Sequence, residues 1–141
     1  MSMLRKSMAY VSIFSMLLFA GCGNKVPNLT GTWEQTEADG FTQVAEITAD
    51  TISVYWCEDD GETRILYWAG SFEPPTSSEV PYIWDSKNDT AKTNVSILAS
   101  PDATKEFVYD GNELTYDVTF MGIATRVHMI QVKEGAGYGG K

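Results

Sequence analysis

The stretch TISVYWCEDDGETRILYWAGS, residues 51–71, decides the fold class. Two runs rich in β-branched and aromatic residues flank a polar segment that contains Asp60-Gly61. Such a pair strongly indicates a two-residue β-hairpin turn, because glycine readily takes the positive φ that the favoured turns require. The stretch therefore predicts two antiparallel strands, at residues 52–57 and 63–72.

The same alternation of apolar and polar residues continues on both sides of this hairpin. It predicts further strands at residues 32–36, 42–48, 82–85, 94–99, 105–109, 113–121 and 125–133. No stretch between Leu29 and Lys133 shows a convincing 3.6-residue apolar period. We therefore expect an all-β domain at residues 29–133, with eight or nine strands in a small antiparallel up-and-down barrel.

Pairing Asp59 with Glu62 divides the first hairpin into two faces. The inner face carries Trp56 opposite Ile65, Val54 opposite Tyr67 and Ile52 opposite Ala69. The outer face carries Tyr55, Leu66 and Trp68, an apolar cluster that is typical of a contact surface. The alternative is that the connection at residues 72–82, or the segment that follows the N-terminal tether at residues 22–28, covers this cluster. A one-residue slip of register would exchange the two faces.

A second turn signal, Asp110-Gly111, predicts a second hairpin from the strands at residues 105–109 and 113–121. The alternation along these strands gives it an apolar inner face and a polar outer face. The inside carries Phe107, Tyr109, Leu114, Tyr116, Val118 and Phe120. The candidates for an interior ligand site are Val54, Trp56, Tyr67, Phe107, Tyr116 and Phe120. Because most of these side chains are bulky, they could also fill a small barrel by themselves.

The first 21 residues have the layout of an export signal. Arg5 and Lys6 precede an uncharged, mostly apolar segment that ends in small residues. This segment is shorter than the roughly 20 apolar residues of a bilayer-spanning helix. A cleaved leader is therefore the better interpretation.

The residues Leu18, Phe19, Ala20, Gly21 and Cys22 resemble the lipobox of bacterial lipoprotein signal peptides, although leucine is commoner than phenylalanine at the second position. The resemblance implies cleavage after residue 21, a diacylglycerol on the cysteine thiol and a short tether at residues 22–28. The protein would then be exported and anchored to the outer face of the cell membrane. The alternative is an ordinary secreted protein that is cut near Ala20.

Charge excludes one class of partner. The formal net charge of the chain is −9, and cleavage would change it to −11 because only Arg5 and Lys6 are lost. Nucleic acids are bound largely through lysine and arginine, so we expect no nucleic-acid partner.

The stretch NLTGTWEQT, residues 28–36, contains Gly31, Thr32 and Trp33. It resembles the Gly-x-Trp signature on the first strand of lipocalins and related calycin barrels. In that family the tryptophan closes one end of the barrel and a basic residue on the last strand packs across it, a part for which Arg126 is the candidate here. The chain departs from the family in its shorter domain, in lacking a clear Thr-Asp-Tyr motif, and in having no convincing C-terminal helix.

Nearly the full chain is similar to uncharacterised small lipoproteins of Gram-positive bacteria, their phages and prophages. The segments ILYWAGSF, WDSKNDTAKT, LASPDATKEFVYDG and LTYDVTFMG carry this similarity. It supports the membrane-surface location and supplies no chemistry, but it raises one idea about function, since some phage-derived lipoproteins block DNA entry by later phages. The last segment, residues 134–141, is Gly-rich and expected to be flexible.

Catalytic patterns are scarce. His128 is the only histidine, no nucleophile motif is present, and Cys57 would be the only thiol left after lipidation of Cys22. The acids near residues 58–62 and 85–89 lack the spacing of a calcium loop. We therefore expect a binding protein without catalysis, cofactor or metal. It would hold either a small apolar ligand inside the barrel or an envelope or phage protein on the outer face.

Overall fold

The computed structural model describes residues 25–37, 41–58 and 62–133. Four expectations lie outside these residues, namely the leader at 1–21, the lipidation site Cys22, the Asp60-Gly61 turn and the Gly-rich tail at 134–141.

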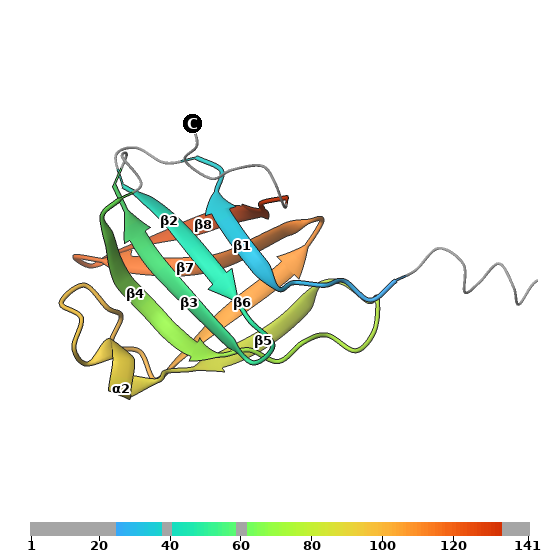
Figure 1. Cartoon of the computed structure of the whole chain (residues 1–141), viewed down its shortest axis with the longest axis horizontal. Helices are drawn as coiled ribbons and strands as arrows, with labels where there is room; N and C mark the ends of the chain where they lie inside the picture. The colour runs from blue at the N-terminus through green and yellow to red at the C-terminus, as the bar shows by residue number, and fades with distance from the viewer. Residues whose placement is uncertain (1–24, 38–40, 59–61, 134–141) are drawn as a thin grey trace, which may run out of the picture.

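Eight antiparallel strands form a nearly closed up-and-down barrel, so the predicted fold class is confirmed (Figure 1). The strands are β1 (Gly31–Gln35), β2 (Thr42–Ile47), β3 (Thr51–Cys57), β4 (Arg64–Ser71), β5 (Tyr82–Lys87), β6 (Thr104–Asp110), β7 (Glu113–Phe120) and β8 (Ile123–Gln131). Their order in the sheet is β4-β3-β2-β1-β8-β7-β6-β5. One short helix, α2 (Thr90–Thr93), follows β5.

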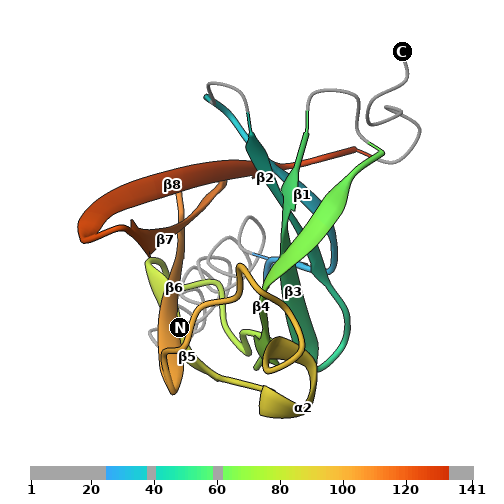
Figure 2. The same cartoon turned by 90° about the vertical axis from the view of Figure 1, so that its left-hand side faces the viewer.

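The two ends of the barrel differ in what they carry. Residues 25–30 enter β1 at one end, here called the closed end, on the right of Figure 1. The other end, here called the mouth end, carries the β1–β2, β3–β4, β5–β6 and β7–β8 connections. Figure 2 looks onto the mouth end and shows the strands arranged as a ring, with α2 at its lower edge.

The first hairpin contains a β-bulge that changes its inner face. Trp56 pairs with Ile65 and Tyr55 with Leu66, as predicted. Val54, however, pairs with Trp68 and not with Tyr67, because the register shifts between Val54 and Tyr55. A bulge places two residues of one strand opposite one residue of its partner, so all later pairs move by one residue.

The bulge turns Trp68 into the barrel. Its side chain is 0% exposed, and its indole N–H donates a hydrogen bond to the Ser86 hydroxyl at 2.9 Å. The prediction that Trp68 belongs to an exposed outer face is therefore wrong.

The predicted strand at residues 94–99 is also wrong. This segment follows α2 as a series of turns along the free edge of β4. The Asp89 and Ser100 amides donate to the Ala69 and Tyr67 carbonyls, each at 2.8 Å, and the Ser96 hydroxyl donates to the Leu66 carbonyl at 2.6 Å. These bonds satisfy the edge of β4 without a further strand.

The barrel closes where β4 meets β5. Among the described residues a single backbone bridge joins them here, between Gly70 of β4 and Asn88, the residue that follows β5. A Cβ atom on Gly70 would lie 2.3 Å from the Ser86 Oγ and 2.6 Å from the Lys87 carbonyl oxygen. Closure therefore requires glycine at this position.

The second hairpin turns one residue later than predicted. Asp110 pairs with Glu113, and the turn residues Gly111 and Asn112 have φ values of 62° and 70°. The later turn changes which residues pair across the hairpin, but it leaves the same side chains on each face, so the two faces are as predicted. The residues Phe107, Leu114, Tyr116 and Val118 are buried.

Aromatic side chains fill the closed half of the barrel. The rings of Phe72, Trp84, Phe107 and Tyr116 follow one another with centroid separations of 4.9, 5.1 and 5.0 Å. Trp33 lies buried at the closed end, where its indole N–H donates to the Leu29 carbonyl at 2.9 Å. These buried, mutually packed side chains form the core of this half of the barrel.

Candidate functional site: a pocket at the barrel mouth

An open pocket of about 440 Å³ occupies the mouth end. It is lined by Gln35, Glu37, Phe41, Gln43, Trp56, Leu98, Val118, Phe120, Thr125 and Val127. This volume lies within the range of roughly 300–1,000 Å³ that is usual for small-molecule sites. The pocket is therefore large enough for a small organic ligand.

Trp56 forms the centre of the pocket wall. Its ring makes edge contacts with Phe41, Tyr67 and Phe120, at centroid distances of 6.5, 5.7 and 6.4 Å. Tyr67 is buried behind it, whereas Phe41 and Phe120 are 48% and 55% exposed. The wall thus offers apolar, partly solvated aromatic surface that a ligand could cover.

Phe120 was expected inside the barrel, and the structure places it at the rim of the pocket. It is the last residue of β7 and pairs with Ile123 across the β7–β8 turn. Its side chain lies on the inner face of β7, as predicted. Because Phe120 is the last residue of the strand, the ring lies at the end of the barrel and is 55% exposed.

A buried polar pair lies at the base of the pocket. Gln43, only 1% exposed, pairs with Trp56 and faces inward. The Tyr116 hydroxyl donates to the Gln43 Oε1, while the Gln43 backbone N–H donates to the Gln35 Oε1 at 3.0 Å. The Gln43 Nε2 has no hydrogen-bond partner among the described residues.

Burial raises the pKa of the Tyr116 phenol well above its usual 10.0, and the nearby Tyr67 phenol raises it further. The phenol therefore keeps its proton and acts as a hydrogen-bond donor. The sequence analysis did not single out Gln43. The signal that could have found it is the pairing of β2 with β3, which sets Gln43 opposite the inward-facing Trp56.

The predicted interior residues divide between the pocket and the core. Trp56 and Phe120 line the pocket. Val54, Tyr67 and Phe107 are buried in the packed core instead. Tyr116 belongs to the core as well and reaches the pocket through its bond to Gln43. The interior is thus filled in one half and open in the other.

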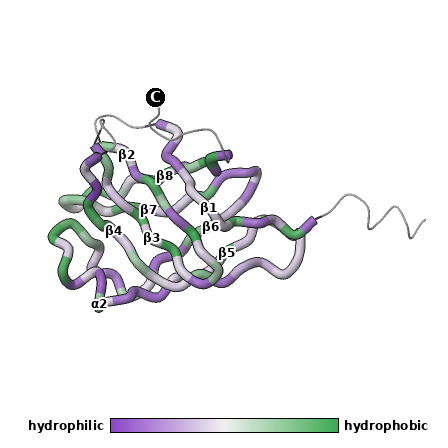
Figure 3. The backbone as a smooth tube through the Cα atoms, viewed as in Figure 1, coloured by the Kyte–Doolittle hydropathy of each residue, from purple (hydrophilic) through white to green (hydrophobic). Residues whose placement is uncertain are grey.

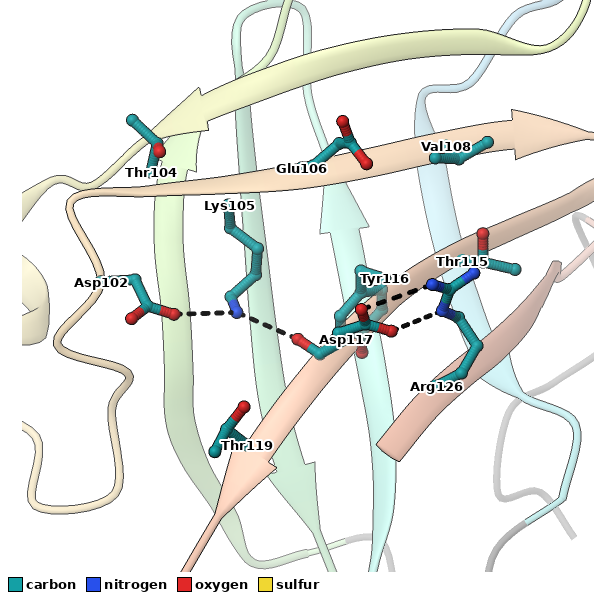
Figure 4. A pocket seen from close by; sticks show the side chains of 10 residues that line it. All are labelled: Asp102, Thr104, Lys105, Glu106, Val108, Thr115, Tyr116, Asp117, Thr119 and Arg126. Atoms are coloured by element: carbon teal, nitrogen blue, oxygen red, sulfur yellow. Dashed lines mark hydrogen bonds and ion pairs between the residues drawn. The ribbon is translucent and has the colours of Figure 1, made fainter. Parts of the chain in front are cut away.

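A second, polar cleft of about 230 Å³ lies where β6 and β7 separate (Figure 4). The two strands pair from Val108↔Thr115 to Asp110↔Glu113, and beyond these pairs the Lys105 side chain crosses the gap. Its ammonium group donates to the Asp117 carbonyl oxygen at 3.1 Å and lies 3.6 Å from the Asp102 carboxylate.

Lys105 is only 7% exposed, and its ammonium also lies 5.1 and 5.4 Å from the ring centroids of Tyr67 and Trp68. Cations are attracted to the faces of such rings at these distances. The buried lysine thus links the separated strands to the inner wall formed by β4.

The prediction that Arg126 packs across Trp33 is wrong. Arg126 faces outward beside the polar cleft, where its Nε lies 2.5 Å from the Asp117 Oδ1 (Figure 4). The reason is the alternation along β8, in which Val127 and Met129 point inward and Arg126 points out. This hydrogen bond to Arg126 lowers the pKa of the Asp117 carboxyl from its ordinary 3.8. Both cations of the cleft are therefore engaged by groups of the protein itself.

The outer face of the first hairpin is less exposed than predicted. Tyr55 and Leu66 are half-buried, and Trp68 has turned inward. The Arg64 guanidinium lies over the Tyr55 ring at 4.6 Å and forms a 3.3 Å ion pair with Glu46. The three residues therefore do not form one open apolar surface.

The remaining reactive side chains lie away from the pocket. Cys57 is completely buried, and the His128 Nδ1 lies 3.0 Å from the Glu113 carboxylate on the outside of the barrel. Within residues 25–37, 41–58 and 62–133, no three His, Cys, Asp or Glu side chains are grouped to hold a metal ion. No helix in these ranges is long and apolar enough to cross a membrane.

No family model, no curated protein and no solved structure matches the chain.

Proposed function

We propose that the protein is a non-catalytic binding module that holds a small apolar ligand in the mouth pocket. The observation that carries this proposal is the contrast between the two halves of the barrel. Aromatic rings fill the closed half, whereas the mouth half leaves an open space of about 440 Å³ beside Phe41, Trp56 and Phe120. A ligand that covered this aromatic surface would gain from its removal from water.

The proposal includes the lipid anchor at Cys22 that the lipobox resemblance implies. Residues 25–30 enter the barrel at the closed end, opposite the mouth (Figure 1). In a protein anchored at Cys22 to the outer face of the membrane, the pocket would thus open away from the lipid surface. It would receive its ligand from the surroundings of the cell and not directly from the bilayer.

Native mass spectrometry of the protein purified from its own host tests the ligand. We expect an extra mass that disappears on denaturation, and analysis of the released molecule would identify it. A bare protein mass, together with no binding of added apolar compounds, would contradict the proposal. The anchor is tested separately by labelling cells with radioactive palmitate, which should mark the wild type and leave Cys22→Ala unlabelled.

A second function, binding of an envelope or phage protein, is favoured by one observation at the same end. The exposed rim residues Val95, Ile97, Met121 and Ile123 are 83%, 89%, 85% and 68% exposed. In Figure 3 much of the connection after α2 is green, the colour of hydrophobic residues. Large apolar side chains exposed to water on a protein surface are typical of interaction sites.

This second function is best tested at the four rim residues. The predicted face of Tyr55, Leu66 and Trp68 is not a suitable target, because Trp68 is buried. Val95→Ser with Ile97→Ser should abolish capture of a partner and any exclusion of later phages while ligand binding persists. Unchanged exclusion and capture in the double variant would remove the rim from consideration.

A further inference from the structure

The unpaired amide of Gln43 is the polar feature of the mouth pocket that the barrel itself does not explain. Its side chain is 99% buried by relative area, it lines the pocket, and its Nε2 has no hydrogen-bond partner among the described residues. A buried donor without a partner costs free energy, and such groups in folded proteins commonly point to a missing partner.

The orientation of this amide follows from its neighbour. The Tyr116 hydroxyl donates to the Gln43 Oε1, which leaves the two Nε2 hydrogens for another acceptor. Burial raises the pKa of the Tyr116 phenol, so near neutral pH the phenol is protonated and remains the donor to the Gln43 Oε1. The base of the pocket therefore contains a hydrogen-bond donor that is unpaired among the described residues and lies just beneath the pocket surface.

The charges of the pocket restrict the acceptor. No lysine or arginine is among the described residues that line the pocket, and Glu37 contributes a carboxylate. The chain as a whole carries a formal charge of −9. A buried anion without a cationic partner is unfavourable, so a carboxylate or phosphate would be a poor occupant.

Most of the remaining wall is apolar, and Gln35, Glu37 and Thr125 are its other polar residues. Phe41, Trp56, Leu98, Val118, Phe120 and Val127 surround the space above the amide. A ligand that fits this wall is mostly hydrocarbon, with its one polar atom at the buried end.

We propose that the ligand is a neutral, largely apolar molecule whose buried end carries a carbonyl-type oxygen, and that the Gln43 Nε2 donates a hydrogen bond to this oxygen. This inference rests on the proposed ligand-binding function and adds the chemical class of the ligand. It assigns Gln43 as the residue that determines specificity and Tyr116 as the residue that positions it.

Three compounds of matched size test the inference by isothermal titration calorimetry with the full-length protein. They are 2-acetylnaphthalene, which has a neutral carbonyl, 2-ethylnaphthalene, which has no acceptor, and 2-naphthoate, which is an anion. We expect the wild type to bind the ketone, to bind the ethyl compound more weakly, and to bind the anion most weakly.

The informative variant is the pair Gln43→Leu with Tyr116→Phe. Gln43→Leu alone leaves the Tyr116 hydroxyl buried without its partner and could unfold the barrel, whereas the double variant removes both polar groups together. We expect its preference for the ketone over the ethyl compound to fall by about 3- to 10-fold. Tyr109→Phe is the matched control, because it removes a tyrosine hydroxyl that bonds Asn112 at the closed end and should keep the preference.

The possible results separate the two proposals. An unchanged ketone preference in the double variant, or binding of 2-naphthoate as tight as that of the ketone, would overturn the inference and leave ligand binding intact. Failure of all three compounds to bind the wild type would overturn the proposed function as well. A loss of preference in Tyr109→Phe equal to that in the double variant would also refute the assignment to Gln43.

Discussion

The Trp68 indole N–H donates a hydrogen bond to the Ser86 hydroxyl at 2.9 Å, and both side chains are 0% exposed. This bond joins β4 to β5 where the barrel closes. Among the described residues the only backbone bridge here is that of Gly70 with Asn88, the residue after β5, so side chains supply much of the connection. The bulge at Tyr67 makes this possible, because it turns Trp68 toward the inside.

Removal of the hydroxyl in Ser86→Ala should destabilise the protein. The Trp68 N–H would stay buried without an acceptor, at a cost of about 1–3 kcal/mol in the free energy of unfolding. Urea denaturation measures this value. Ser77→Ala, at an exposed position of the β4–β5 connection, is the control and should change this free energy by less than about 0.5 kcal/mol. Equal effects of the two substitutions would show that the bond contributes nothing.

Gly70→Ala should weaken barrel closure. The added Cβ would lie 2.6 Å from the Lys87 carbonyl oxygen, which is backbone and cannot rotate away. We expect a loss of about 1–3 kcal/mol, the usual cost of overpacking. Thermal denaturation followed by circular dichroism checks this, and a wild-type melting temperature would argue against a tight contact between β4 and β5.

Lys105→Met should destabilise the seam between β6 and β7. The methionine keeps much of the apolar stem but loses the ammonium that bonds the Asp117 carbonyl and lies beside Asp102. We expect a loss of about 1–3 kcal/mol and faster amide hydrogen exchange in the separated parts of the two strands. Lys92→Met on α2, whose side chain is 62% exposed, is the matched control and should have little effect. Protection that stays at the wild-type level in Lys105→Met would contradict this role.

The Asp117–Arg126 pair should make a small contribution to acid stability. Its hydrogen bond lowers the folded-state pKa of Asp117 below the ordinary 3.8, so the unfolded state binds the proton more readily. The stabilisation is present above the unfolded pKa and is lost as the pH falls through the folded pKa. Because both side chains are more than half exposed, we expect only about 0.2–1 kcal/mol.

The pKa of Asp117 can be followed by NMR titration of its carboxyl carbon. In Arg126→Gln this pKa should return toward its ordinary value, and the acid-side loss of stability should become smaller. A pKa that does not move in this variant would assign the shift to another cause.

Phe120→Ala should separate ligand binding from stability. The ring lies at the rim of the pocket and is 55% exposed, so its removal should reduce affinity for 2-acetylnaphthalene by about 3- to 10-fold with little change in unfolding. Ile83→Ala on β5 is 51% exposed and lies outside the pocket, so it serves as the control. Equal affinities of wild type and Phe120→Ala would exclude this ring from the site.

The sequence predicts the strands well, because most of them alternate between a buried and a solvated face. It also predicts the faces of the second hairpin. The turn lies one residue later than predicted, but this changes only the pairing and not the side of the sheet on which each side chain lies. The bulge at Tyr67 has no local signal in the run of apolar residues from Ile65 to Ala69. Its effect is to reverse the predicted direction of Trp68.

Other features depend on contacts between distant segments. Val95 and Ile97 alternate with polar residues as a strand would, yet both are exposed, so their alternation does not report burial. Gln43 looks like a polar residue on an outer face until the pairing with β3 is known. The candidate site could therefore be placed inside the barrel from sequence, but its polar base could not.

Around its circumference, the barrel consists of two four-stranded sets, β1–β4 and β5–β8, which are joined to each other at few backbone positions. β1 and β8 pair at three positions, from Trp33↔Gln131 to Gln35↔Met129, and on the opposite side stands the single bridge between Gly70 and Asn88. Residues of both sets line the mouth pocket, for example Trp56 of β3 and Val127 of β8. A ligand bound at the proposed site would contact both sets of strands and would stabilise the folded barrel against the unfolded chain. Filled and empty molecules should then differ in their lifetime against proteases, so the supply of ligand would set how long each copy persists.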